Sequence, residues 1–228
     1  MKPEIMNFDT ANGATTAVVA RPDTEAESAV VLIHEWWGIN DHMRELALRY
    51  AKEGYLCVAP DLFRGKVAKN ADEAAQLMKD LPMADGLDTI DSAIAEIRHS
   101  YAVDQIGITG HCMGGTFALA AACEIGDLAA AAPFYGDIPE EDTLAKLSVP
   151  TLFIAAARDG WITPEKVNAM KKAAEKYDLP VEVVSYDADH AFFNETRPEV
   201  YDPKSAADAW RRVLSHFQKH LALSNDDS

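Results

Sequence analysis

The sequence predicts an α/β fold in which helices cover both faces of a mostly parallel sheet. First, short apolar runs alternate with helix-like runs along almost the whole chain, an order typical of parallel sheets with crossover helices. Second, the strand-like runs are continuously apolar rather than alternating, as expected for strands that are buried on both faces. In such a sheet the functional residues lie beyond the carboxyl ends of the strands.

In chain order, the first predicted strand is residues 30–33 (VVLI). An amphipathic helix follows over residues 41–53, where Gly54 supplies a stop signal. Residues 55–59 (YLCVA) then form a strand. Residues 71–79 and 88–100 are predicted helices.

The second half continues the alternation. The predicted segments are a strand at 106–109, an Ala-rich helix at 114–123, strands at 129–135 and 151–156, a helix at 164–177, a strand at 181–186 and a closing helix at 205–221. Thr163 is a good N-cap and Pro164 suits the first helical position. Because there is no repeat, linker or change in composition, we expect one domain over residues 1–228, with a flexible tail at 222–228.

Composition and charge exclude several classes of function. The chain has 228 residues, of which 48% are hydrophobic and 25% charged, so it can bury a core. The 21 Lys and Arg residues against 37 Asp and Glu residues leave a net charge of −16. This argues against nucleic-acid binding and against attraction to anionic lipid, both of which need clustered basic side chains. We therefore expect a small-molecule partner and a monomer.

The cysteine pattern indicates a reducing compartment and no metal. Cys57, Cys112 and Cys123 make an odd number, and no apolar run is long enough for a signal peptide or a membrane span. We therefore expect free thiols, a cytoplasmic protein, and Cys57 and Cys123 as small buried apolar groups. No Cys-x-x-Cys motif is present, and His216 and His220 have no third ligand nearby in the sequence, so we expect neither a metal nor a cofactor.

The most informative motif is residues 110–115 (GHCMGG), where a predicted strand runs directly into a helix. A nucleophile in such a turn has strained backbone angles and needs small neighbours, here Gly110 and Gly114. The helix N-terminus favours a thiolate, and the backbone N–H of Met113 can stabilise an oxyanion. The motif is a nucleophile elbow with Cys112 in place of Ser, although a Gly-rich turn around a structural Cys would look the same.

Two later strand ends supply the partners that a nucleophile needs. The strand at 151–156 leads to Asp159, and the strand at 181–186 leads to His190. The order nucleophile, acid, base is that of hydrolases built on such a sheet. We therefore predict Cys112 as nucleophile, His190 as general base and acid, and Asp159 as the group that orients His190. His111 is a poor rival because neighbours in a tight elbow point apart, and we expect Asp187 and Asp189 to serve the local turn.

A second unusual segment is residues 34–38 (HEWWG), after the first predicted strand. This loop normally supplies the other oxyanion donor, here the backbone N–H of Trp36. Glu35 is unexpected, because a carboxylate beside the thiol raises the thiol pKa. One interpretation is a salt bridge to a nearby Arg. The other is a gate that keeps Cys112 protonated and protected from oxidation until substrate displaces Glu35.

The chain resembles the dienelactone hydrolase family. The matching segments are residues 34–38 (HEWWG), 60–63 (PDLF), 110–115 (GHCMGG), 158–159 (RD) and 190–193 (HAFF), and the resemblance extends from residue 30 to the last helix. It implies an α/β-hydrolase fold, no cofactor, a Cys-His-Asp triad that hydrolyses an enol-lactone, and a Glu near the Cys. Family members that act on dienelactone hold its carboxylate with arginines. This chain has Asn194 at one of these positions, with Arg197 nearby, and offers Arg64 near the other.

A thiol nucleophile also restricts the substrate. A thiolate is itself a good leaving group, so attack is productive only when the substrate's leaving group is better, as in activated esters and lactones. The segment 136–150 is too short for a large cap domain, so we expect an open pocket walled by Trp36, Trp37, Trp161 and Phe192. The sequence thus predicts an ester or lactone hydrolase that works through a thioester. The alternatives are a thioesterase or acyl transferase on the same scaffold, or a binding protein without catalysis.

Overall fold

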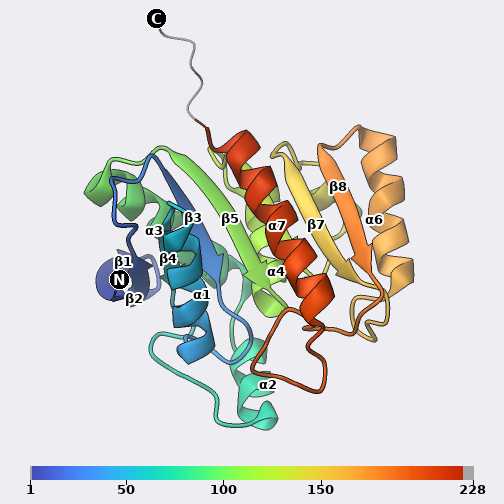
Figure 1. Cartoon of the computed structure of the whole chain (residues 1–228), viewed down its shortest axis with the longest axis horizontal. Helices are drawn as coiled ribbons and strands as arrows, with labels where there is room; N and C mark the ends of the chain where they lie inside the picture. The colour runs from blue at the N-terminus through green and yellow to red at the C-terminus, as the bar shows by residue number, and fades with distance from the viewer. Residues whose placement is uncertain (1, 223–228) are drawn as a thin grey trace, which may run out of the picture.

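The computed structural model describes residues 2–222, which form an eight-stranded sheet with helices on both faces (Figure 1). The strands are β1 (Glu4–Thr10), β2 (Gly13–Ala20), β3 (Ser28–Ile33), β4 (Leu56–Pro60), β5 (Gln105–His111), β6 (Ala130–Phe134), β7 (Thr151–Ala156) and β8 (Val181–Tyr186). The helices are α1 (Asp41–Lys52), α2 (Ala71–Lys79), α3 (Met83–Tyr101), α4 (Met113–Glu124), α5 (Glu141–Leu144), α6 (Pro164–Tyr177) and α7 (Pro203–His220). The tail predicted at 222–228 lies almost wholly outside the described residues.

The strand order is β1-β2-β4-β3-β5-β6-β7-β8. All pairs from β4 to β8 are parallel, which confirms the predicted α/β class. The antiparallel hairpin β1–β2 at one edge was not predicted. Its signal is the dipeptide Asn12-Gly13, since Gly13 has a φ of +110° at the tight turn and Asn-Gly is the commonest hairpin signal.

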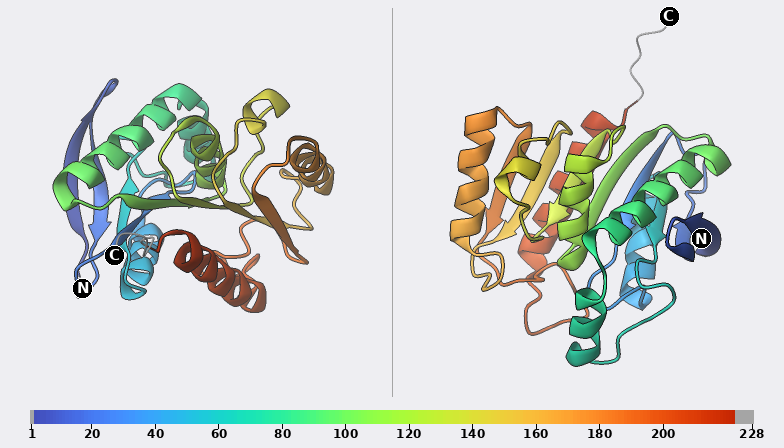
Figure 2. Two further views of the ribbon diagram at one scale, coloured as in Figure 1. Left: turned by 90° about the horizontal axis from the view of Figure 1, so that it is seen from above. Right: turned by 180° about the vertical axis from the view of Figure 1, so that it is seen from behind.

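Each face of the sheet has its own hydrophobic core. Helices α1 and α7 cover one face, and α3, α4 and α6 cover the other (Figure 2). Alternate residues of one strand serve the two cores: Val31 and Ile33 face the α3–α4 side, whereas Val30 and Leu32 face the α1–α7 side. This double burial explains why the strand sequences are continuously apolar.

The predicted elements are present, with shifted ends. Helix α3 begins at Met83 rather than residue 88. Helix α7 begins at Pro203 rather than residue 205, and the side chain of Asp202 caps it by accepting from the Ser205 N–H at 2.7 Å. Thr163 caps α6 as predicted, with Pro164 in the first turn. Among the described residues no helix is long and apolar enough to cross a membrane.

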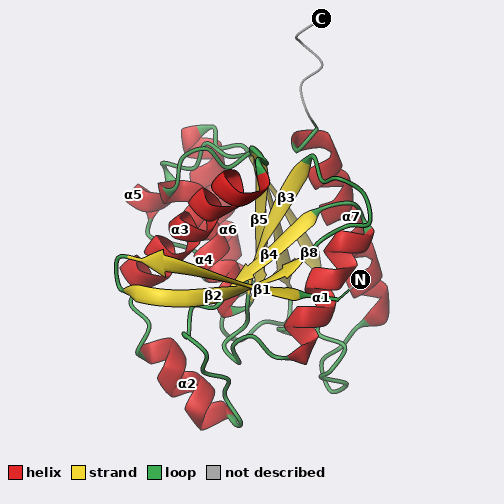
Figure 3. Ribbon diagram, turned by 90° about the vertical axis from the view of Figure 1, so that its left-hand side faces the viewer, coloured by secondary structure: helices red, strands yellow, loops and turns green. Residues whose placement is uncertain are grey.

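The carboxyl ends of β3, β5, β7 and β8 meet at one edge of the sheet, where the arrowheads in Figure 1 point. Helix α2 stands apart from the two helical layers, as Figure 3 shows, and buries only Ala74. It reaches the site edge through Met78, which lines a cavity there.

The buried histidine of the elbow packs away from this cavity. The ring of His111 lies 4.3 Å from the ring of Phe134 and is stacked 5.0 Å from that of Phe193, measured between centroids. Neither ring nitrogen has a hydrogen-bond partner within residues 2–222. Burial lowers the pKa of His111 well below its ordinary value, and the neighbouring His42 and Arg49 add to this effect.

This packing predicts an acid-dependent loss of stability. Below about pH 6.5 the unfolded chain binds a proton at His111 that the folded chain does not, so the free energy of unfolding falls by up to about 1.4 kcal/mol per pH unit. His111→Phe removes this part of the pH dependence. Urea denaturation at pH 8, 6.5 and 5.5 measures it, with the pH slope as readout. Equal slopes for the two proteins would contradict the prediction, even though buried His34 and His42 keep some slope in both.

Candidate active site

Cys112 lies in a strained turn between β5 and α4. Its φ is 57° and its ψ is −118°, in the positive-φ region that residues other than Gly rarely adopt. Its backbone N–H donates to the Phe134 carbonyl of β6 at 3.1 Å, and its carbonyl accepts from the Thr116 N–H of α4 at 3.1 Å. These two hydrogen bonds stabilise the strained backbone conformation of Cys112. In this conformation the side chain points away from the sheet, as the elbow motif predicts.

The glycines of the motif are required by close backbone contacts. A Cβ on Gly114 would lie 2.2 Å from the Ile33 carbonyl oxygen and 2.7 Å from that of His34. A Cβ on Gly110 would lie 2.3 Å from the Gly114 carbonyl oxygen. The start of α4 is therefore pressed against the end of β3, which brings Cys112 close to the loop that carries Glu35.

Asp159 and His190 are joined by a short hydrogen bond. His190 Nδ1 and Asp159 Oδ2 lie 2.5 Å apart, and the carboxylate is buried. The other carboxylate oxygen accepts from the N–H groups of Trp161 (2.8 Å) and Ile162 (3.0 Å). Burial alone would raise the pKa of Asp159, but the contact with His190 and these N–H groups lowers it. Asp159 is thus an anchored carboxylate that fixes the orientation of the imidazole.

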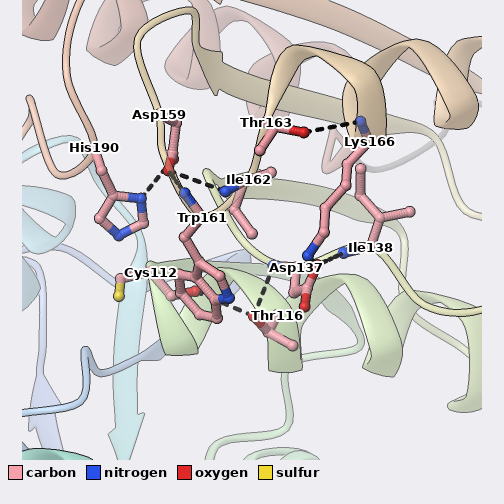
Figure 4. A network of polar contacts seen from close by, with 10 residues as sticks. All are labelled: Cys112, Thr116, Asp137, Ile138, Asp159, Trp161, Ile162, Thr163, Lys166 and His190. Carbon is pink, nitrogen blue, oxygen red and sulfur yellow. Dashed lines mark hydrogen bonds and ion pairs between the residues drawn. The ribbon is translucent and has the colours of Figure 1, made fainter.

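The second ring nitrogen of His190 is buried and has no hydrogen-bond partner in the described part of the chain. Figure 4 shows this nitrogen on the side of the ring that faces the Cys112 sulfur, opposite the bond to Asp159. Cys112 and His190 line the same cavity. The structure therefore brings together the three residues that were predicted from separate parts of the sequence.

Burial disfavours ionisation of the Cys112 thiol. Burial raises the pKa of Cys112 to about 12, and the charge of Glu35 adds to this effect. The backbone N–H of Met113 acts in the opposite direction. An anion at this sulfur thus needs either a proton acceptor or the removal of the Glu35 charge.

Glu35 is paired with an amide rather than with an arginine. Asn194 Nδ2 donates to Glu35 Oε2 at 2.7 Å, and the Asn194 Oδ1 accepts from the N–H and the hydroxyl of Thr196 at 3.0 and 2.7 Å. Burial raises the pKa of Glu35 to about 7, whereas the Asn194 bond and the charge of Arg197 lower it. The salt-bridge interpretation is therefore wrong for the direct contact. Sequence reasoning noted Asn194 only as a replacement for an arginine and did not predict its bond to Glu35.

His34 holds the loop that carries Glu35 and Trp36. Its Nδ1 lies 2.7 Å from the Glu35 carbonyl oxygen, and its Nε2 accepts from the Leu62 N–H at 3.1 Å. The Leu62 contact assigns the proton to Nδ1. Among the described residues the Trp36 N–H donates to no acceptor. The first N–H of α4, at Met113, has no acceptor within its own helix.

A cavity of about 320 Å³ lies over these residues. Its wall consists of Glu35, Trp36, Trp37, Met78, Cys112, Trp161, His190, Ala191 and Arg197. Three residues predicted to bind substrate, Trp37, Trp161 and Arg197, thus lie in it. Met78 was not predicted, because nothing in the sequence of α2 indicates that it reaches the site.

Two predicted substrate-binding residues lie elsewhere. Phe192 is fully buried in the core on the α1–α7 face of the sheet. Its ring packs against the rings of Tyr135 and Tyr186 and not against the cavity. Arg64 pairs with Asp85 of α3 at 2.9 Å and does not line the cavity. Both expectations are corrected.

The remaining candidates are outside the site. Arg158 bonds the carboxylates of Asp187 and Asp189, which therefore serve the local turn. Cys57 and Cys123 are buried free thiols. No group of three or more His, Cys, Asp or Glu residues with a metal-binding arrangement occurs among residues 2–222.

The chain is similar in sequence and in fold to known proteins. The sequence model of the dienelactone hydrolase family matches residues 15–221. The chain is 36% identical to the protein named usf of Aquifex pyrophilus (84% of this chain, 88% of the relative). It is 34% identical to a protein of Aquifex aeolicus provisionally named carboxymethylenebutenolidase (86% of this chain, 90% of the relative). A crystal structure from Klebsiella pneumoniae, provisionally described as a dienelactone hydrolase, superposes with a TM-score of 0.85 at 28% identity, covering 96% of this chain and 100% of the other.

The elbow contacts predict a sharp difference between two glycines. Gly114→Ala forces a Cβ into the Ile33 carbonyl, so we expect a loss of at least about 2 kcal/mol in the free energy of unfolding. Gly126→Ala is the matched control, because no atom lies within 4 Å of its added Cβ. Urea denaturation compares the two variants. A Gly114 variant as stable as the Gly126 variant would refute the packing described for the elbow.

Proposed function

Since this chain belongs to the dienelactone hydrolase family, we propose that Cys112, His190 and Asp159 are its catalytic triad. The chain is a hydrolase, an esterase or lactonase. The observation that carries the proposal is the state of His190: Asp159 holds Nδ1 at 2.5 Å, while the buried Nε2 has no partner among the described residues and faces the cavity that Cys112 lines.

The proposed first half-reaction is thiol acylation. His190 Nε2 takes the proton of the Cys112 thiol as the sulfur attacks the substrate carbonyl carbon. The C–S bond forms and the carbonyl π electrons move to oxygen. The N–H groups of Met113 and Trp36 are the proposed donors to this oxyanion, since the Trp36 N–H has no acceptor among the described residues and the Met113 N–H lies beside the Cys112 sulfur at the start of α4. Collapse of the intermediate expels the alkoxide or enolate, which takes the proton from His190 Nε2, and leaves a thioester with His190 neutral again.

The second half-reaction is hydrolysis of the thioester. His190 takes a proton from water, the hydroxide attacks the thioester carbonyl, and the thiolate leaves and is protonated again. The sulfur competes with the substrate's leaving group. Esters that release a phenolate or an enolate, and strained lactones, therefore react, whereas unactivated amides do not. Small activated esters and lactones are therefore the proposed substrate class.

Glu35 is proposed to keep the thiol unreactive until substrate binds. Its carboxylate raises the pKa of Cys112 and lines the same cavity, so a substrate that enters the cavity meets both groups. Displacement of Glu35 from the sulfur lowers the thiol pKa only when a substrate is present. A thiol that stays protonated at rest is slow to oxidise, because oxidants react with the thiolate.

Replacement of the nucleophile tests the triad. Cys112→Ala should lower kcat for 4-nitrophenyl acetate at least about 10³-fold, as removal of a triad nucleophile does. Cys123→Ala is the control and should retain turnover, since Cys123 lies at the far end of α4. Circular dichroism and urea midpoints verify that both variants fold. Full turnover by a folded Cys112→Ala protein would assign the reaction to another nucleophile.

Replacement of the gate tests the role of Glu35. Glu35→Gln keeps an acceptor for Asn194 but removes the charge, so Cys112 should react several-fold faster with iodoacetamide at pH 8.5. At pH 6 the two proteins should react at similar rates, because Glu35, with a pKa of about 7, is then mostly protonated in the wild type. Mass spectrometry confirms that the label is on Cys112. Unchanged or slower alkylation at pH 8.5 would exclude the gate.

A further inference from the structure

The cavity is small and its wall is mostly apolar. At about 320 Å³ it is near the lower limit of ligand pockets, so it suits one aromatic ring with a short acyl group. Trp36, Trp37 and Met78 form apolar parts of the wall, and Trp161 closes it next to His190, with ring centroids 5.5 Å apart. Such a wall binds a flat uncharged group through its faces and edges.

The cavity has few cationic side chains that could bind an anion. Arg197 is the only Lys or Arg among the residues that line it. Its Nε is bonded to Glu199 Oε1 at 2.9 Å, so its charge is already matched by a carboxylate. Arg64, the other arginine predicted to bind substrate, lies outside the cavity lining and is paired with Asp85.

The hydrogen-bond partner of Glu35 is a neutral amide. Asn194 is fixed by Thr196 and donates to Glu35 within the site. Glu35 itself is a buried acid on the cavity wall, and above neutral pH its charge repels a second carboxylate. A carboxylate-bearing substrate would therefore lose its hydration and gain a single arginine whose Nε is already bonded to Glu199.

We propose that this site selects uncharged aryl esters over the same esters bearing a carboxylate. The inference rests on the proposed function, because it specifies the substrate class of the same cavity. It is carried by the apolar wall, the Arg197–Glu199 pair and the neutral Asn194 next to Glu35.

Two isosteric esters test the proposal. 4-Acetoxybenzamide and 4-acetoxybenzoate have the same shape and differ by one charge, and each kcat/KM is divided by the rate constant of alkaline hydrolysis of that ester. We expect the amide-bearing ester to be preferred at least tenfold at pH 7.5. The preference should be larger at pH 8.5 than at pH 6, because Glu35 is ionised at the higher pH. A benzoate that reacts equally well or better would overturn the proposal.

A variant tests the assigned cause. Glu199→Gln releases Arg197, so it should raise kcat/KM for 4-acetoxybenzoate several-fold relative to 4-acetoxybenzamide. Glu175→Gln on α6 is the matched control, since it removes the same charge from an exposed position that does not line the cavity. An unchanged ratio in the Glu199 variant would overturn the role of the Arg197–Glu199 pair.

Failure of the inference and failure of the proposed function are distinguishable. If Cys112→Ala abolishes turnover of both esters but the charged ester is not disfavoured, only the inference fails. If both esters are hydrolysed without Cys112, the proposed function fails first.

Discussion

The start of α4 is in backbone contact with the end of β3, and the rest of the site depends on this approach. The contact leaves no room for a methyl group on Gly114, and it holds Cys112 at a φ that an L-residue adopts only under constraint. Because β3 and β5 are adjacent in the sheet, the same approach places the Glu35 loop beside the elbow. One steric constraint thus determines both where the thiol points and which carboxylate it meets.

The electrostatics of the site follow from burial rather than from net charge. The chain carries a net charge of −16, yet the site combines a buried acid, a buried thiol and one matched arginine. Asp159 is stabilised as an anion by two backbone N–H groups and a direct bond to His190, whereas Glu35 has one direct bond, from the Asn194 amide, and the charges of Arg197 and His190 nearby. Two carboxylates in one site therefore differ in pKa, and this difference suits one to orient an imidazole and the other to respond to a ligand.

The cavity depends on an element that contributes little to either core. Helix α2 buries only Ala74, yet its Met78 forms part of the cavity wall. The side chains of the proposed triad follow the ends of sheet strands, whereas this part of the wall is formed by a helix outside the two layers (Figure 3). The proposed reacting groups thus lie on elements with many packing contacts, whereas part of the substrate-binding wall lies on a helix with few.

The amino-acid sequence by itself determined the α/β class, most element positions and the three residues that follow β5, β7 and β8. Local patterns suffice for these, because parallel strands are buried on both faces and their carboxyl ends share one edge. Only the tertiary structure decided that Asn194 bonds Glu35, that Phe192 belongs to the core, that Arg64 is matched by Asp85 and that Met78 reaches the cavity. These facts depend on side-chain direction and on contacts between segments far apart in the chain, for example the 159 residues that separate Glu35 from Asn194. No local sequence pattern predicts contacts between residues that are so far apart in the chain.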